Sequence, residues 1–234
     1  MHPAGGQNKV MTTARRPEVV AFDVNETLVS LEPVRRRLVE AGERPEQLEL
    51  FFARTLQHGF ALTCLDEWLP FRRVAAAALR QTTTGRLDDG QIEHVLAAFG
   101  ELPPYQDVAP AFERLAGAGV RIVTLTHGPA STATAMLERT GLDRYVEAVL
   151  TGESVRSWKP PRAPYLYAAA TCGVAPEWMA LVAAHAWDCH GARRAGLVTG
   201  WVSRLEGTVA DIYTPADVVG DTLVEVADGL LALP

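Results

Sequence analysis

A short apolar run that ends in a polar residue recurs along the chain, and it constrains the fold more than any other feature. Val19–Phe22 leads into Asp23, and comparable runs stand at 120–125, 179–183 and 196–202. Such runs, rich in β-branched residues, are typical of parallel strands that are buried on both faces. From about residue 106, helical stretches separate them, at 109–118, 130–140, 164–172 and 189–195. The alternation predicts an α/β fold with a doubly wound parallel sheet, in which ligands bind at the carboxyl ends of the strands.

Residues 31–100 contain helical patterns and no convincing strand. The predicted helices span 31–41, 45–58, 67–80 and 88–99, with breaks at Gly42, Gly59 and 82–85. A chain of 234 residues is long enough for one sizeable core with a smaller insertion. We therefore predict a helical cap domain at 31–100, inserted into an α/β core domain made of 17–30 and 101–234, and a flexible tail at 1–16.

Composition and charge exclude several classes of protein. The apolar fraction of 48% and the charged fraction of 21% are ordinary for a globular protein. A formal net charge of −6 offers no electrostatic basis for binding nucleic acid. No stretch approaches the roughly 18 consecutive apolar residues of a membrane span, and the N-terminus lacks the apolar segment of a signal peptide. The three cysteines are scattered, so we expect a cytoplasmic protein that binds neither nucleic acid nor membranes.

The first predicted strand delivers an acidic residue followed by a tight turn and a threonine, in Asp23-Val24-Asn25-Glu26-Thr27. A carboxylate at this place faces the ligand crevice of the sheet, and N–H groups of the turn can keep it ionised. Those conditions suit a nucleophile in covalent catalysis. Asp at a strand-to-helix junction is also a common helix cap, so the motif alone leaves both interpretations open.

Three further polar residues follow later strands or precede a helix. Thr126, together with N–H groups of the helix after Gly128, can bind a substrate anion, although Thr also caps helices. Lys159 stands before a helix. A Lys is usually a surface residue, so its position alone does not indicate a role. Asp188 follows the next strand and can pair with Lys159, which keeps the ammonium charged and directed at Asp23.

In this order, Asp23, Thr126, Lys159 and Asp188 resemble the four motifs of the haloacid dehalogenase superfamily, and the helical insertion resembles its cap. The resemblance extends from Val19 to about Arg204 and is closest to the 2-haloacid dehalogenase group. It implies a Rossmann-like core and a small 2-halo carboxylate as substrate. Asp23 would displace the halide and form an ester, and water would then attack the carbonyl of Asp23.

The resemblance also implies roles for the other site residues. Arg54 would hold the leaving halide, Thr126 would bind the substrate carboxylate, and Lys159 with Asp188 would stabilise charge around Asp23. The remaining residues expected at the substrate are Asn25, Thr27, His127 and Tyr165, of which Tyr165 would line the pocket and orient its neighbours. For His127, contact with the carboxylate and a helix cap both stay open. The group suggests short L-2-haloacids, converted to 2-hydroxy acids, and a homodimer is common in it.

Asn25 separates two reaction classes. Phosphatases of the superfamily resemble one another in carrying a second Asp at this position, because an alkoxide leaving group must be protonated. An amide cannot supply that proton, whereas departing chloride or bromide does not require one. Phosphatases also need magnesium beside the phosphate, while Lys159 is enough to offset a monoanionic substrate. We therefore expect no metal and no cofactor.

Glu26 and His185 depart from the pattern of the group, in which many members have Gly and Asn at these positions. A Glu oriented toward an imidazole is a recognised way to make a general base. We hypothesise that His185, oriented by Glu26, activates the water that hydrolyses the ester. The alternative is a His with its hydrogen bonds satisfied beside a solvated Glu.

Two other functions stay open at this point. The first is a phosphatase, or a hydrolase of another small acid, that uses the same nucleophile with an altered pocket. The second is a binding protein without activity, because a fold does not guarantee catalysis. The accepted halogen, chain length and stereoisomer depend on pocket dimensions that the sequence does not reveal.

Overall fold

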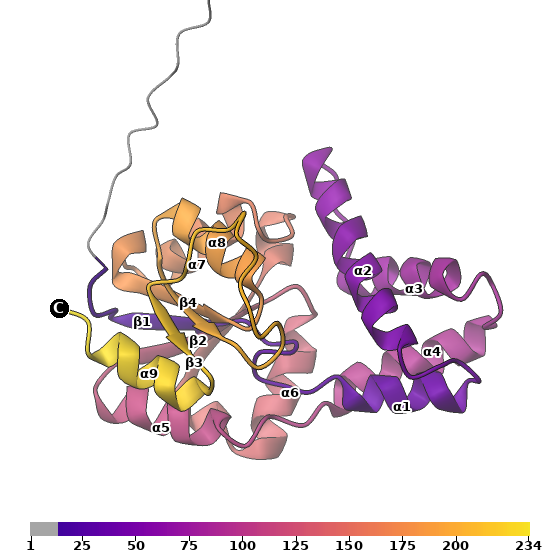
Figure 1. Cartoon of the computed structure of the whole chain (residues 1–234), viewed down its shortest axis with the longest axis horizontal. Coiled ribbons are helices and arrows are strands. Elements are labelled where there is room, and N and C mark those ends of the chain that lie inside the picture. The colour runs from indigo at the N-terminus through magenta and orange to yellow at the C-terminus, as the bar shows by residue number, and fades with distance from the viewer. Residues whose placement is uncertain (1–13) are drawn as a thin grey trace, which may run out of the picture.

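The computed structural model describes residues 14–234, so positions 1–13 of the predicted tail lie outside the described residues. Within that range, six parallel strands form one sheet in the order β3-β2-β1-β4-β5-β6 (Figure 1). They are β1 (Val19–Phe22), β2 (Arg121–Thr126), β3 (Val146–Thr151), β4 (Met179–Ala183), β5 (Val198–Val202) and β6 (Val218–Gly220). The predicted doubly wound α/β fold is confirmed. Strands β3 and β6 add to the four that the sequence predicts.

Helices cover both faces of the sheet. Figure 1 shows α5 (Val108–Gly117) and α9 (Leu223–Leu231) on one face, and α7 (Arg162–Thr171) and α8 (Ala186–Ala195) on the other. Successive side chains of a strand point to opposite faces. Accordingly Val20 and Phe22 of β1 pack in the cluster with α5 and α9, while Val19 and Ala21 pack in the cluster with α7 and α8. Burial on both sides explains why β1 is continuously apolar.

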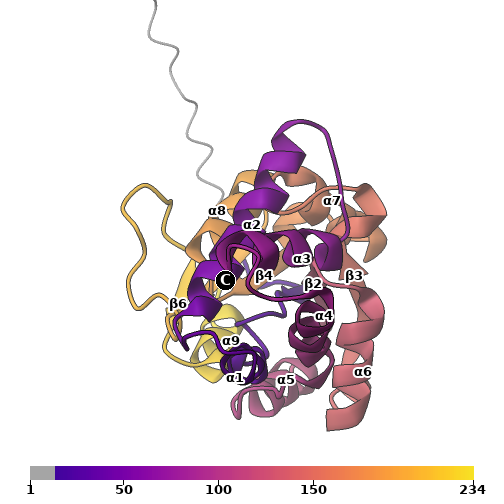
Figure 2. The same cartoon turned by 90° about the vertical axis from the view of Figure 1, so that its right-hand side faces the viewer.

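The segment between β1 and α5 forms the helical cap. Its elements are α1 (Glu32–Glu40), α2 (Gln47–Cys64), α3 (Phe71–Thr82), α4 (Asp89–Ala97) and the 3-10 turn η1 (Ala98–Glu101). Figure 1 shows these helices beside the sheet, and Figure 2 looks onto them from the side of the cap. Helix α3 buries Phe71, Val74, Ala75, Ala78 and Leu79, which recur at helical spacing and form its inner face.

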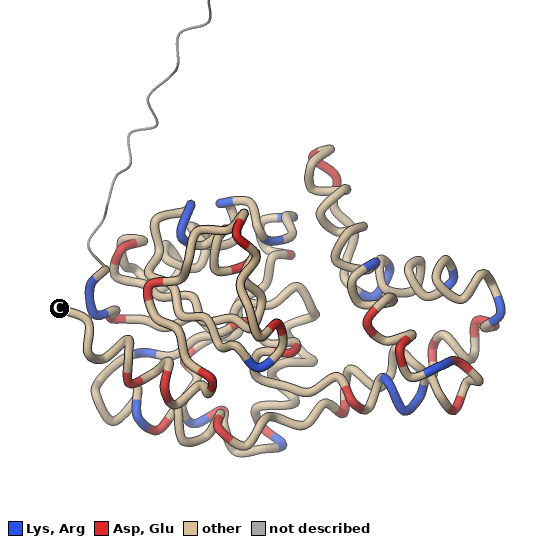
Figure 3. Tube along the Cα trace, in the orientation of Figure 1, with Lys and Arg blue, Asp and Glu red and all other residues tan. Residues whose placement is uncertain are grey.

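Basic and acidic residues are interspersed along the cap and around the core (Figure 3). In the cap, Arg35 of α1 pairs with Glu49 of α2 at 2.6 Å, and Arg72 of α3 pairs with Glu93 of α4. Solvent-exposed pairs of this kind contribute about 0–1 kcal/mol each. These ion pairs therefore add little to the stability of the cap.

Helix α2 runs through Gly59, where the sequence predicts a break, so that prediction was wrong. An ideal Cβ at Gly59 would lie 2.3 Å from the ring of Trp158, which means that only Gly allows the helix to approach this ring. The indole N–H of Trp158 donates to the carbonyl of Leu69 at 3.2 Å, and its backbone N–H donates to Thr63 at 3.1 Å. Trp158 thus joins the cap to the core segment that carries Lys159.

The strand order brings three polar strand ends together. Phe22 of β1 is in register with Thr124 of β2 on one side and with Val182 of β4 on the other. The residues that follow these strands therefore meet at one edge of the sheet, at the point where the strand order reverses. This edge faces the cap, and the candidate site lies there. Among the helices of residues 14–234, none is long and apolar enough to cross a membrane.

Candidate active site

A buried cation lies between two carboxylates at the carboxyl edge of the sheet. The ammonium Nζ of Lys159 donates to Asp23 Oδ1 at 2.8 Å, to Asp188 Oδ2 at 2.5 Å and to the carbonyl of Leu125 at 3.2 Å. The side chains of Lys159, Asp23 and Asp188 are only 1%, 11% and 0% exposed. Three acceptors satisfy the three donors of the ammonium, so the charge is held in a fixed position. The three residues that the sequence placed at separate strand ends are in direct contact.

The electrostatics of this cluster favour an ionised nucleophile. Burial alone would raise the pKa of the Asp23 carboxyl, but the charges of Lys159 and His185 outweigh it and hold this pKa below its ordinary value. Burial lowers the pKa of Lys159, while Asp188 and Asp23 raise it by more. At neutral pH, Asp23 is therefore a carboxylate beside a permanently charged ammonium.

Thr27 and Tyr165 hold this cluster in place. The hydroxyl of Thr27 donates to Asp23 Oδ2 at 2.7 Å and accepts from the backbone N–H of Ala184 at 2.9 Å. The hydroxyl of Tyr165 donates to Asp188 Oδ1 at 2.6 Å. Both side chains are fully buried, and neither lines a cavity at the site. Both hydroxyl groups thus orient a carboxylate, which agrees with the expectation that Tyr165 orients its neighbours, and contact of either residue with substrate stays a prediction.

His185 lies between Glu26 and Asp23. Its Nε2 is 3.0 Å from Glu26 Oε2, and its Nδ1 is 3.9 Å from Asp23 Oδ2. Burial lowers the pKa of His185, but the hydrogen bond with Glu26 and the charge of Asp23 raise it by more, to above its ordinary value. Within the described residues, Nδ1 is buried and has no hydrogen-bond partner. A buried polar atom without a partner marks a place where water or a ligand is expected.

The backbone of Glu26 is unusual in a way that supports this contact. Its φ of 64° lies in the left-handed region, where a residue other than Gly costs roughly 1–2 kcal/mol. Such strain persists only where the surroundings determine the conformation, and it is common at functional sites. The hydrogen bond to His185 is an interaction that Gly at this position would not provide.

His127 is held in one tautomer. Its Nε2 accepts the backbone N–H of Lys159 at 2.9 Å, so the proton of the neutral ring resides on Nδ1. Burial, and then the charge of Lys159, lower the pKa of His127 well below its ordinary value. His127 therefore enters the site as a neutral N–H donor.

Thr126 lies at the end of β2, before helix α6 (Ala130–Thr140). The backbone N–H of Gly128 donates to the Thr126 hydroxyl oxygen at 3.0 Å, which leaves the hydroxyl hydrogen available for another acceptor. The first N–H groups of a helix have no partner within the helix and attract anions. Thr126 and the start of α6 can therefore bind a carboxylate together.

Comparison with known proteins agrees with this geometry. The sequence model of the haloacid dehalogenase-like hydrolases matches residues 17–196. The (S)-2-haloacid dehalogenase 4A of Burkholderia cepacia is 32% identical over 163 residues, which cover 69% of this chain and 68% of the relative. The chain belongs to the haloacid dehalogenase-like hydrolase family.

Two solved dehalogenase structures extend the match to most of the chain. A dehalogenase with an intermediate complex is 26% identical, with a TM-score of 0.84 over 94% of this chain and 99% of that chain. The L-2-haloacid dehalogenase of Xanthobacter autotrophicus with chloropropionic acid covalently bound shares the fold, with a TM-score of 0.84 at 20% identity. That match covers 93% of this chain and 100% of that chain.

A small cavity of about 10 Å³ adjoins the nucleophile in this member of the family. Its walls combine polar side chains of the core with apolar side chains of the cap: Asp23, Asn25, Phe52, Leu56, Phe71, Thr126, His127, His185 and Trp187. Phe52, Leu56, Phe71 and Trp187 are wall residues that the sequence does not single out as site residues. Their helical spacing indicates burial, but it does not tell which apolar side chains face the nucleophile.

Arg54, the residue expected to hold the halide, does not line this cavity. It lies in α2 two residues after Phe52, and residues two apart in a helix point in nearly opposite directions. Within residues 14–234, it makes no hydrogen bond or ion pair to another side chain at the site. The expected contact of Arg54 with the halide therefore stays a prediction, and Phe52 of the same helix lines the wall of the cavity.

Among residues 14–234, no three His, Cys, Asp or Glu side chains are grouped so as to hold a metal ion. Asn25, which takes the position of the second acid of family phosphatases, lines the cavity as an amide.

Proposed function

We propose that this protein hydrolyses L-2-halo carboxylic acids to 2-hydroxy acids and halide, with Asp23 as the nucleophile. The observation that carries the proposal is the Lys159–Asp23 contact, in which a rigid, ionised carboxylate borders a cavity next to an anion-binding strand end. The names of the relatives, an (S)-2-haloacid dehalogenase and an L-2-haloacid dehalogenase with chloropropionic acid covalently bound, support the same chemistry.

In the first step, a carboxylate oxygen of Asp23 attacks the carbon that bears the halogen. A new C–O bond forms as the carbon–halogen bond breaks, and the halogen leaves as an anion with the bonding electron pair. The Thr126 hydroxyl and the start of α6 hold the substrate carboxylate. No proton is needed for departure of the halide, so the amide of Asn25 is sufficient where a phosphatase requires an acid.

Groups that line the cavity can stabilise the leaving halide in addition to Arg54, whose role stays a prediction. The Nδ1–H of His127 is a neutral donor at the cavity wall, and the aromatic rings of Phe52, Phe71 and Trp187 line the same space. The edge of an aromatic ring carries partial positive charge. We infer that this N–H donor and these rings surround the halide.

In the second step, water attacks the Asp23 carbonyl carbon, and His185 accepts its proton. Ester formation removes the negative charge of Asp23, which in the resting state helps to raise the pKa of His185. The pKa then falls, and the free base form becomes available. Its unpartnered Nδ1, 3.9 Å from Asp23 Oδ2, is placed to hold the attacking water, while Glu26 orients the opposite nitrogen.

Halide release from L- and D-2-chloropropionate without added metal tests the reaction class. We expect halide from the L isomer and an ester on Asp23 by mass analysis of trapped enzyme. Magnesium-dependent release of phosphate from small phosphate esters, without halide release, would establish the phosphatase alternative. Absence of all turnover, together with unchanged ligand binding by Asp23→Asn, would favour the non-catalytic alternative.

A variant of His185 tests the second step. In His185→Ala, we expect displacement to continue and the ester to accumulate, because general base catalysis contributes typically 10²–10⁴-fold. The matched control is His94→Ala, which removes an exposed histidine of the cap. If His185→Ala turned over without accumulating ester, the proposed role of His185 would be wrong.

The homodimer and the cytoplasmic location stay predictions. We propose that the partner of the site is a 2-halo carboxylate substrate and that neither nucleic acid nor a membrane takes part in the reaction.

A further inference from the structure

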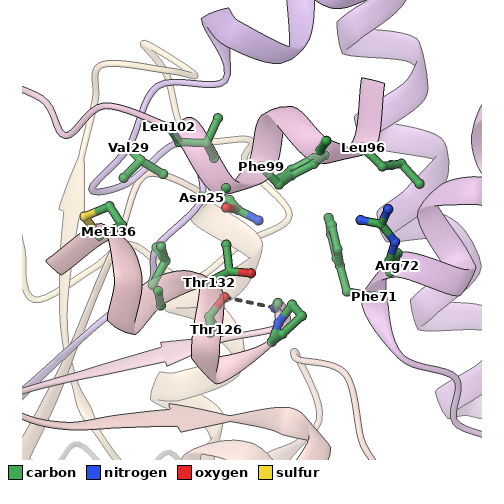
Figure 4. Close-up of a pocket in the computed structure, with 16 residues that line it drawn as sticks. Asn25, Val29, Phe71, Arg72, Leu96, Phe99, Leu102, Thr126, Thr132 and Met136 are labelled. Atoms are coloured by element: carbon green, nitrogen blue, oxygen red, sulfur yellow. Dashed lines mark hydrogen bonds between the residues drawn. The ribbon is translucent and has the colours of Figure 1, made fainter. Parts of the chain in front are cut away.

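A second, much larger cavity lies beside the nucleophile, between the cap and the core. Its volume is about 210 Å³. Figure 4 shows Phe71, Leu96 and Phe99 of the cap and Val29 and Met136 of the core around this space. The mechanism proposed above uses only one end of this cavity, at Asn25, Thr126 and the start of α6, and leaves the apolar remainder without a role.

The large cavity adjoins the place of reaction. Asn25, Phe71 and Thr126 line both this cavity and the small one at Asp23. Since Thr126 is the expected partner of the substrate carboxylate, a substrate bound there has its C2 carbon near the junction of the two cavities. A group attached to C2 can therefore extend past Asn25 into the larger space.

The two volumes differ enough to decide where a long substituent fits. The cavity of about 10 Å³ at Asp23 holds roughly one water-sized group, whereas the large cavity, at about 210 Å³, has about twenty times that volume. A methyl group or a halogen fits at Asp23, but several methylene groups do not.

The residues that line the large cavity favour an apolar group over a charged one. Arg72 is the single charged residue among those that line the large cavity, and its guanidinium pairs with Glu93. Most of the remaining walls are apolar, including Leu102 and Ala133. An apolar chain satisfies such walls, whereas a second charged group on the substrate would find no free partner of opposite charge there.

We propose that this cavity binds the apolar C2 substituent of the substrate, so that the enzyme acts best on medium-chain 2-halo acids of roughly five to eight carbons. Asn25, at the junction, is then a residue that determines specificity for chain length. This inference rests on the proposed dehalogenase function.

The expected effect follows from the burial of methylene groups, each of which favours binding by about fourfold. L-2-chlorohexanoate has three more methylene groups than L-2-chloropropionate, which gives an upper limit of about sixtyfold. We expect kcat/KM to be at least tenfold higher for the hexanoate.

Helix α6 offers a matched pair of variants for the test. Ala133 is buried and lines the cavity, while Ala135, two residues later on the same helix, is exposed. In Ala133→Phe, the ratio of kcat/KM for hexanoate over propionate should fall at least tenfold, because the ring fills the cavity. The same change in Ala135→Phe should leave the ratio as in the natural protein. Met136→Phe, at another wall position, provides a second variant if Ala133→Phe does not fold.

Two results separate this inference from the proposed function. Hydrolysis of chloropropionate with no preference for the hexanoate, or with equal ratios in all variants, would overturn the chain-length inference alone. Binding of unreactive hexanoate more tightly than propionate, measured by calorimetry and lost in Ala133→Phe, would support the cavity even if no halo acid were hydrolysed. In that case the proposed function alone would fail.

Discussion

Replacing Lys159 by Met removes a cation that contacts two buried carboxylates. Lys159 lies 2.8 Å from Asp23 and 2.5 Å from Asp188, with 1% of its side chain exposed. Loss of one partner of a buried ion pair costs about 3–5 kcal/mol, because the remaining charge is left without compensation. A domain of this size loses about 2–4 °C of Tm per kcal/mol. We therefore expect the Tm of Lys159→Met to fall by roughly 6–20 °C.

The pH dependence of this loss has a definite sign. In the natural protein, the pKa of Asp23 is held below its ordinary value, so its charge stabilises the fold above that value, and this stability is lost as the pH falls below about 4. Without Lys159, burial raises the pKa of Asp23, and stability is lost as the pH increases through the raised pKa. The destabilisation of Lys159→Met should thus be larger at pH 8 than at pH 5.

Urea denaturation at pH 5 and pH 8 measures both effects. Arg80→Met is the matched control, since Arg80 pairs with Asp89 at 2.8 Å on the exposed surface of the cap. Removal of that pair should cost less than about 1 kcal/mol. A loss below 1 kcal/mol in Lys159→Met, or an equal loss at the two pH values, would refute the reasoning.

Other perturbations test separate parts of the structure. Gly59→Ala should lower the stability by about 1–3 kcal/mol, because the Cβ of the new Ala would overlap the ring of Trp158. Calorimetry should show no such loss for the control Gly117→Ala, where an added Cβ meets no atom within 4 Å. Thr27→Val should lower the free energy of unfolding by about 1–3 kcal/mol, because it leaves the backbone N–H of Ala184 without an acceptor. It should also raise the pKa of Asp23, so that the rate of halide displacement falls at a higher pH on acidification than in the natural protein. Glu26→Gln should lower the pKa of His185, because the hydrogen bond and charge of Glu26 raise it. When the single-turnover rate of ester hydrolysis is plotted against pH, the rate should rise at a lower pH and reach a lower plateau than in the natural protein. An unchanged profile for Glu26→Gln would contradict the proposed contact.

The core of the fold and the charged centre of the site are predictable from the sequence, because both follow from strand ends. A run such as Val19–Phe22 can be buried only within a sheet covered on both faces, and Asp23 then lies at the edge of that sheet. Asp188 follows β4 at the same edge, and Lys159, in the segment between β3 and α7, contacts both carboxylates there. Strands β3 and β6 escape prediction because β3 is partly exposed and β6 has only three residues.

Contacts between distant segments account for the errors. Gly59 lowers the helix propensity of α2, yet the ring of Trp158, about a hundred residues later, fits only against Gly. The presence of an Arg in the cap does not determine which side of α2 faces the nucleophile, so Arg54 and Phe52 are assigned only by the three-dimensional structure. The structure also shows which carboxylates the hydroxyl groups of Thr27 and Tyr165 hold, which the sequence does not reveal.

A single turnover in water enriched with oxygen-18 tests the central claim most directly. Enzyme in excess over L-2-chloropropionate reacts once, and the peptide that contains Asp23 is then analysed by mass spectrometry. Attack of water on the ester carbonyl predicts that the heavy oxygen appears in the Asp23 carboxylate and not in the hydroxy acid. Heavy oxygen in the hydroxy acid, with an unlabelled Asp23, would show that water displaces the halide directly and would contradict the account.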